Sequence, residues 1–461
     1  MPSDENQNLT PTSANAEAPV SVAPAQSNSS SPPPNAIRYG PNNSPTTKSH
    51  KKLFTLLGVL ILVGILFSVA YYFKHRNTAT ANPTVSLKSV SSSFTTANDN
   101  FGVNVFSQLV KQSPQTNVLI SPVGIAMALS MVYNGANGST QTAMQKVLNY
   151  QGLSLNTINN SSSALVTGLK NSDPEVTLSI ANSIWLKKSF KVNQSFLNTA
   201  QKDYRAKATT LDFNSPSAPN TINNWVRNAT DGKIPTIVQN IPSSEIMYLI
   251  NAVYFKGAWH TKFDPSQTRS YPFTTGSSST VQAKLMTQTG TYNYYSDNSI
   301  QAIQLPYGKN QRITMNVYLP TNITTFLQNI SYAQLASIDS KYTQQQGTVL
   351  LPKFTLSYSQ NLNGTLKALG MGVALNPYGA ANFNGIAKKI HISELKHKAY
   401  IDVNEQGTTA AAATSVGLIS NAVAGPSSGF YMEVDKPFVL TIQDKLTNEV
   451  LFVGAIQNPG Q

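Results

Sequence analysis

The pattern of apolar and polar positions divides the chain into four stretches. Residues 1–47 are rich in Pro, Ser, Asn, Ala and Thr and nearly lack large apolar side chains. Such a segment cannot bury enough apolar surface to offset the entropy of ordering. An uncharged apolar run between basic flanks follows. We therefore predict a disordered polar tail (1–47), a transmembrane signal-anchor (48–76), a stalk (77–91) and a folded domain (92–461).

The apolar run extends from Leu53 to Phe73. As a helix it would be about 31 Å long, which matches the hydrocarbon core of a bilayer. This predicts a single-pass protein that contacts the membrane through residues 53–73 and holds its folded domain on the extracytoplasmic side. Small residues also predict signal-type cleavage after Ala70 or Ala81, so release of the domain is an alternative, and a buried core helix is another.

Beyond residue 92 the pattern changes to a mixture of helical and strand periodicity. Phe101, Val105 and Leu109 recur at helical spacing, and two further helical runs follow before residue 150. Later segments are short and rich in β-branched and aromatic residues, as strands are: residues 304–307, 313–319, 400–403, 438–442 and 450–456. Because helices mostly precede strands, we predict an α+β fold.

Composition narrows the classes of function. The net charge is +13, but Lys and Arg are scattered through the folded part rather than gathered in a stripe with aromatic residues. We therefore expect no nucleic-acid partner. The chain has no cysteine, which excludes disulfides, thiolate nucleophiles and thiolate metal sites.

The chain offers no constellation of catalytic residues. It contains five histidines. On a strand, His391 and His397 would share one face while Glu394 would point to the other, so these three do not form a metal site. No nucleophile elbow, phosphate-binding loop or dinucleotide fingerprint is present. We expect a protein that is not an enzyme and that holds neither a metal nor another cofactor.

Several short segments stand out in order along the stretch from about residue 92 to residue 461. They are residues 117–124, 128–131, 135–140, 251–259, 351–354, 397–399, 404–414, 436–438, 451–454 and 458–459. Together, and in this order, they resemble the signature segments of the serpin family of protease inhibitors.

The resemblance implies a serpin fold, with three β-sheets, about nine helices and an exposed reactive loop. It also implies a monomeric serine-type endopeptidase inhibitor that acts as a suicide substrate. The protease cleaves the loop, is held as an acyl-enzyme, and is distorted when the loop inserts into the central sheet. The alternative is a non-inhibitory serpin that serves as an extracellular binding or adhesion module.

The segment that resembles the reactive-loop hinge has the composition that insertion requires. Its alternate residues share one face of a strand, and none of them is charged, so burial leaves no unpaired charge. Four consecutive alanines also suit a helix, but the glycine before them and the threonines around them oppose it. The hinge comprises Glu405, Gly407, Thr408, Thr409, Ala410, Ala411, Ala412, Ala413 and Thr414.

The resemblance also implies two groups of contacts. Lys353, Glu405 and Trp259 correspond to residues at the base of the loop. Ser121, Asn251 and His397 correspond to the polar network beneath the strands that open. The chain departs from the family at Gly124, where a second serine is common, so we expect water or another residue to replace that hydroxyl.

The spacing from the hinge implies a scissile bond between Asn421 and Ala422, with a register uncertain by one or two residues. No Lys or Arg occurs from residue 406 to residue 435, and no Asp or Glu occurs from 406 to 431. This favours elastase- or subtilisin-like serine proteases, which accept Leu418, Ile419 or Ala422. An asparaginyl or other cysteine protease is the alternative if Asn421 is the residue read.

Overall fold

The computed structural model describes residues 89–408 and 429–460 of the chain. The predicted tail, the predicted anchor and nearly all of the predicted stalk lie outside the described residues. So do hinge residues 409–414 and the expected scissile bond between Asn421 and Ala422.

The described residues contain nine α-helices, as expected for the fold. Local signals explain where two of them begin: the side chains of Ser121 and Ser154 accept hydrogen bonds from the first turns of α3 and α5. The helices are α2 (Ser92–Gln112), α3 (Pro122–Tyr133), α4 (Gly138–Val147), α5 (Leu155–Lys170), α6 (Gln194–Tyr204), α7 (Ala218–Ala229), α8 (Ile323–Gln328), α9 (Tyr332–Asp339) and α10 (Asn363–Leu366). Short turns η2 (Pro265–Gln267), η3 (Lys367–Met371) and η4 (Gly372–Leu375) complete the helical part.

One sheet of six strands carries the hinge. Its order is β10, β11, β12, β4, β2, β3. Along β11 every second residue is buried, which is the alternation expected when one face of a sheet covers the core. The strands are β10 (Phe354–Asn361), β11 (Glu394–Asn404), β12 (Gly407–Thr408), β4 (Met247–Ala258), β2 (Val176–Lys187) and β3 (Lys207–Leu211).

The remaining strands form a second hydrogen-bonded network of nine strands. The network runs in the order β1, β15, β14, β8, β7, β6, β9, β13, and β5 pairs with β6. Its strands are β1 (Val118–Ile120), β5 (Arg269–Thr274), β6 (Thr280–Ser296), β7 (Ile300–Pro306), β8 (Ile313–Pro320), β9 (Thr343–Pro352), β13 (Phe430–Glu433), β14 (Phe438–Asp444) and β15 (Val450–Ile456).

The expectation of three separate sheets is therefore corrected, because the described strands pair into two networks. The reason lies in β6, which has 17 residues. Its first part pairs with β5, its middle with β9 and its end with β7. One long strand thus joins what would otherwise be two sheets.

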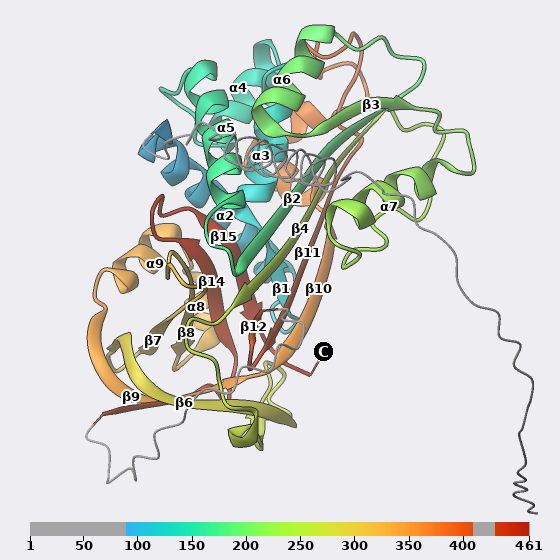
Figure 1. Ribbon diagram of the computed structural model, residues 1–461. Helices are drawn as coiled ribbons and strands as arrows, with labels where there is room; N and C mark the ends of the chain where they lie inside the picture. The colour runs from blue at the N-terminus through green and yellow to red at the C-terminus, as the bar shows by residue number, and fades with distance from the viewer. Residues whose placement is uncertain (1–88, 409–428, 461) are drawn as a thin grey trace, which may run out of the picture. The chain divides into compact units, whose positions relative to one another are not determined.

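The layers of the fold position the hinge. The main core fills the space against the inner face of the six-stranded sheet and includes apolar residues of α2, α3, β8, β14 and β15. A second, smaller core on the outer face includes Trp185, Tyr248 and Val226 and lies beneath α7. Figure 1 shows α4, α5 and α6 gathered at one end of the six-stranded sheet and β12 at the other, near β6 and β9.

The predicted membrane-anchored location is corrected. No helix of the described residues is long and apolar enough to cross a membrane. The longest of them, α2, has 21 residues, but polar side chains such as those of Asn98 and Asp99 interrupt its apolar positions. The run from Leu53 to Phe73, on which the prediction depended, lies outside the described residues.

Candidate functional site

The segment predicted to be the hinge begins as a two-residue strand, β12, between two long strands. Gly407 and Thr408 pair with Asn404 and Val403 of β11 on one side. On the other side they pair, also antiparallel, with Ala258 and Gly257 of β4. Further along, from residue 400 to residue 394, β11 pairs with β4 directly and in parallel. The hinge therefore forms a wedge at one end of a pair of strands that is otherwise closed.

Thr408 is the residue of this wedge that faces the core. Its side chain is 0% exposed, and its hydroxyl lies 2.7 Å from the hydroxyl of Tyr307. The ring of Tyr307 stacks on Trp259, with 4.3 Å between centroids. Sequence reasoning had not singled out Tyr307, because its partners are distant along the chain and its own segment reads only as a strand.

Gly407 adopts a conformation that only glycine tolerates here. Its φ is +139°, in the region that side chains rarely adopt. A Cβ atom at this position would also lie 2.0 Å from the carbonyl oxygen of Gly257. The backbone of the hinge can therefore enter between β4 and β11 only because residue 407 has no side chain.

The residues expected at the base of the loop lie together. Lys353 Nζ is 2.8 Å from a carboxylate oxygen of Glu405, and the hydroxyl of Thr268 donates to the same carboxylate. Burial alone would raise the pKa of Glu405, but hydrogen bonds from Lys353, the backbone and Thr268 outweigh it and lower that pKa. Trp259 Nε1 donates to the carbonyl oxygen of Asn404 at 2.9 Å.

The three residues expected in the polar network also meet, beneath the closed part of the strand pair. The backbone N–H of Ser121 donates to Nε2 of His397 at 3.2 Å, so the proton of the neutral ring is on Nδ1. That atom lies 2.6 Å from Oδ1 of Asn251, to which it donates. His397 is 0% exposed, and burial lowers its pKa to about 3. The ring therefore stays neutral at physiological pH.

The departure at Gly124 has a structural counterpart. A Cβ atom at residue 124 would lie 2.7 Å from Val253 Cγ2 and 2.8 Å from Asn251 Nδ2. The amide of Asn251 thus occupies the space that a serine side chain would need. Its Nδ2 donates to Oδ1 of Asn182 at 2.7 Å. Asn182, which sequence reasoning missed, therefore extends the hydrogen-bond network beyond Asn251.

The strand after the loop is held by aromatic packing. Phe430 stacks on Tyr294 with 3.8 Å between centroids, and Tyr292 meets its edge at 6.0 Å. A Cβ atom at Gly347 would lie 2.3 Å from the Phe430 ring. Strand β13 pairs with β9 alone, in parallel. The alternation of Tyr292 and Tyr294 in the sequence indicates that both face the same side of a strand. It does not indicate that they contact Phe430.

Comparison with known proteins identifies the family. The family model described as serpin (serine protease inhibitor) matches residues 96–459. The chain belongs to the serpin family. The leukocyte elastase inhibitor of Equus caballus is 31% identical over 79% of this chain and 99% of its own. The glia-derived nexin of Mus musculus is 32% identical over 82% of this chain and 97% of its own.

Solved serpin structures agree with the fold. The crystal structure of the thermophilic serpin tengpin in its native state has a TM-score of 0.74 and 29% identity, covering 80% of this chain and 95% of that one. Human thyroxine-binding globulin complexed with its hormone has a TM-score of 0.73 and 28% identity, covering 80% of this chain and all of that one. Serpins are protease inhibitors and not proteases.

The histidine-rich segment of this serpin is used for structure. His391 Nε2 contacts the Ser393 hydroxyl at 3.4 Å, Glu394 pairs with Lys396 at 2.9 Å, and His397 belongs to the polar network. No group of three or more histidine, aspartate or glutamate side chains within residues 89–408 and 429–460 could hold a metal ion.

Proposed function

We propose that this serpin inhibits a serine protease as a suicide substrate, acting as a monomer. The serine hydroxyl of the protease attacks the carbonyl carbon of residue 421. The peptide bond to Ala422 breaks, Ala422 leaves with a new amino group, and residue 421 becomes an ester of the protease. Insertion of the freed hinge into the six-stranded sheet then moves the protease before water hydrolyses the ester.

The observation that carries this proposal is the position of β12. Its two residues already make antiparallel pairs with both β4 and β11. A strand that lengthens from this wedge meets N–H and C=O groups on both sides, so each added residue can form ladder hydrogen bonds with two neighbours. An ordinary surface loop has no such template.

The register of β12 supports the proposal further. If the strand lengthens in this register, residue 410 comes to lie opposite Phe255 and Ile401, and residue 412 opposite Val253 and Ala399. Residues 410, 412 and 414 then share the core-facing side with Thr408. Two of these are alanines and one is threonine, so the inserted strand buries no charge and little volume.

The same register identifies what must open. Residue 414 would enter between Asn251 and His397, whose side chains now share a hydrogen bond of 2.6 Å. Insertion therefore has to break this bond and the parallel pairing of β4 with β11. The buried network therefore opposes opening of the sheet, because it holds β4 and β11 together at the point where the loop must enter.

We infer the target class from composition. Without Lys or Arg in the loop, a protease with an acidic specificity pocket finds no side chain to bind. Small and apolar residues around Asn421 suit elastase- or subtilisin-like enzymes, and one relative is named a leukocyte elastase inhibitor. An asparaginyl or other cysteine protease is the second target class, which would read Asn421 itself.

The test is incubation with pancreatic elastase, subtilisin, an asparaginyl protease and trypsin. We expect an SDS-stable complex with elastase or subtilisin, and mass spectrometry of the released peptide should begin at or within two residues of Ala422. Cleavage without a stable complex, and without a higher melting temperature of the cleaved protein, would overturn inhibition in favour of a binding module. Stable complexes formed at a basic residue with trypsin would refute the target class.

A further inference from the structure

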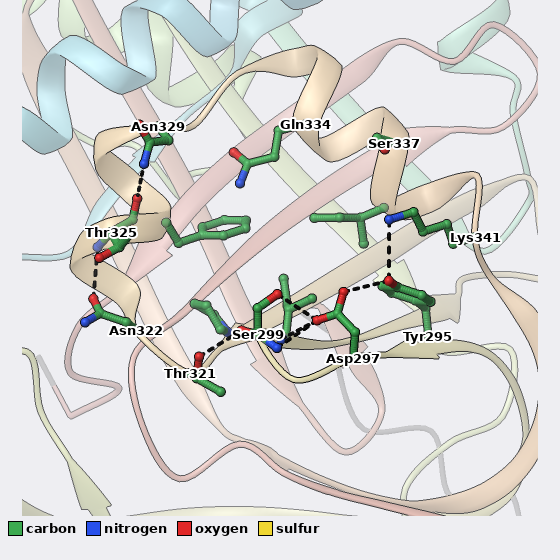
Figure 2. Close-up of a pocket in the computed structure, with 14 residues that line it drawn as sticks. Tyr295, Asp297, Ser299, Thr321, Asn322, Thr325, Asn329, Gln334, Ser337 and Lys341 are labelled. Carbon is green, nitrogen blue, oxygen red and sulfur yellow. Dashed lines mark hydrogen bonds between the residues drawn. The ribbon is translucent and has the colours of Figure 1, made fainter.

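A cavity of about 350 Å³ opens between the helices α8 and α9 and the hairpin of β6 and β7, away from the hinge. Four buried apolar residues line it: Ile300, Pro320, Phe326 and Ile338. Polar side chains surround this apolar lining (Figure 2). An apolar cavity with a few directed polar groups is the usual form of a small-molecule site.

Most of the polar groups at the cavity are already used by the protein. Asp297 accepts hydrogen bonds from the N–H and hydroxyl of Ser299, from the N–H of Ile300 and from the hydroxyl of Tyr295. These bonds lower the pKa of Asp297 to about 2. Its carboxylate therefore shapes the turn between β6 and β7 and has little capacity left for a ligand. Asn322 likewise caps α8 by accepting from the N–H of Thr325.

Two other side chains at the cavity, those of Lys341 and Gln334, keep polar groups that a ligand could bind. Lys341 lies over the ring of Tyr295 at 5.0 Å and contacts its hydroxyl at 3.4 Å. No carboxylate of the described residues forms an ion pair with it. The Oε1 atom of Gln334 is buried and has no hydrogen-bond partner in the described structure. Figure 2 shows both side chains extending over the hollow.

A buried acceptor without a partner costs free energy unless a ligand satisfies it, and Gln334 Oε1 is such an acceptor. Lys341 is exposed, so water solvates its ammonium group, but that group can also pair with an anion at the mouth of the cavity. A ligand that uses both groups carries a negative charge for Lys341, a hydrogen-bond donor for Gln334 and an apolar ring for the lining residues. A cationic ligand would be repelled by Lys341, and Asp297 already accepts four hydrogen bonds within the protein.

We propose that this cavity binds a small aromatic carboxylate that also carries a hydroxyl or N–H donor. The carboxylate pairs with Lys341, the ring lies against Phe326 and Ile338, and the donor binds Gln334 Oε1. The site is separate from the hinge, and the proposal does not depend on protease inhibition.

The probes are the three monohydroxybenzoates, with benzoate to remove the donor and the corresponding hydroxybenzamides to remove the charge. Binding to the folded protein is measured by NMR titration, independently of any protease. We expect at least one hydroxybenzoate to bind, and its amide to bind about tenfold more weakly, as for the loss of one charged hydrogen bond. If no isomer binds, or if amides bind equally well, the proposal is wrong.

Variants locate the site. Lys341→Met should weaken hydroxybenzoate binding about tenfold, whereas Lys188→Met, at an exposed lysine outside the cavity, should leave it unchanged. Gln334→Leu should weaken the hydroxybenzoate but not benzoate. Ser337→Phe, at an exposed lining position, should block both probes. Equal binding by the wild type and Lys341→Met would overturn the assignment.

Discussion

The strand before the reactive loop and the strand after it are held by different chemistry. Strand β12 has two residues, lies between β4 and β11, and is held by backbone pairs and one buried hydroxyl contact. Strand β13 pairs with β9 alone, and the ring of Phe430 is packed against two tyrosines. If β12 lengthens as we propose, the first arrangement buries no large side chain, whereas the second strand is anchored by a large ring. We therefore propose that movement takes place at the hinge end and that the distal end is the anchor.

The largest loss of inhibition is expected for Thr408→Arg. Thr408 is already buried in β12, so an arginine there would displace the start of this strand, at a cost of several kcal/mol. Without that start the strand cannot lengthen, so insertion should fail and the protein should become a plain substrate. We expect the yield of SDS-stable complex with elastase or subtilisin to fall about tenfold or more. The matched control is Thr409→Arg, which would face outward beside Asp402 if the register continues. Equal loss in both variants would contradict the register drawn from β12.

The next largest effect is on the pH dependence of stability, through His397 in the polar network beneath the hinge. Burial lowers the pKa of His397 to about 3 in the folded protein, whereas the unfolded value is about 6.5. Below that value the unfolded state binds the proton and the folded state does not. His397 therefore makes the free energy of unfolding fall by about 1.4 kcal/mol per pH unit as pH drops from 6.5 towards 3.

His397→Gln should remove this contribution, as measured by denaturant unfolding of both proteins at several pH values between 7.5 and 4.5. Burial raises the pKa of the paired carboxyls of Asp99 and Glu449. They contribute a pH slope of opposite sign in both proteins, and this contribution cancels when the two pH profiles are subtracted. Parallel pH profiles for the wild type and the variant would show that His397 is not held neutral.

At the distal end, Phe430→Ala should lower the free energy of unfolding by about 1 to 2 kcal/mol through loss of the stacked pair and its buried area. The matched control is the adjacent Tyr431→Ala, because Tyr431 is 56% exposed and should change stability by no more than about 0.5 kcal/mol. Urea unfolding measures both. A similar loss in the two variants would mean that β13 is held by its backbone and not by the aromatic stack.

The smallest change in the free energy of unfolding is expected for a variant at the base of the loop. Lys353→Met should cost about 0.5 to 1 kcal/mol, because its side chain is 36% exposed and solvent screens the pair. Lys309→Met should cost almost nothing, since the side chains of Lys309 and Glu175 are 71% and 39% exposed. The difference between the two variants should shrink as salt is raised. No such decrease would indicate that Lys353 acts through packing of its stem.

The sequence by itself determined the class of the fold, and it predicts the character of the hinge. Helical spacing in the first part and β-branched runs in the second indicate α+β, because both are local periodicities. Small, uncharged residues at alternate hinge positions follow from what a buried strand can hold. The order of the motifs also indicated that Ser121, Asn251 and His397 belong together, although their geometry had to come from the structure.

Only the tertiary structure decided which distant residues meet. Tyr307 and Thr408 are 101 positions apart, and nothing in either segment indicates the contact. Asn251 lies where a side chain at residue 124 would be and donates to Asn182, which is a matter of space and not of local pattern. Tertiary packing also decides that β6 joins two of the expected sheets. It likewise leaves the side-chain oxygen of Gln334 without a partner among the described residues. Periodicity reports which face of an element is buried, but pairing across the chain depends on the packing of every element at once.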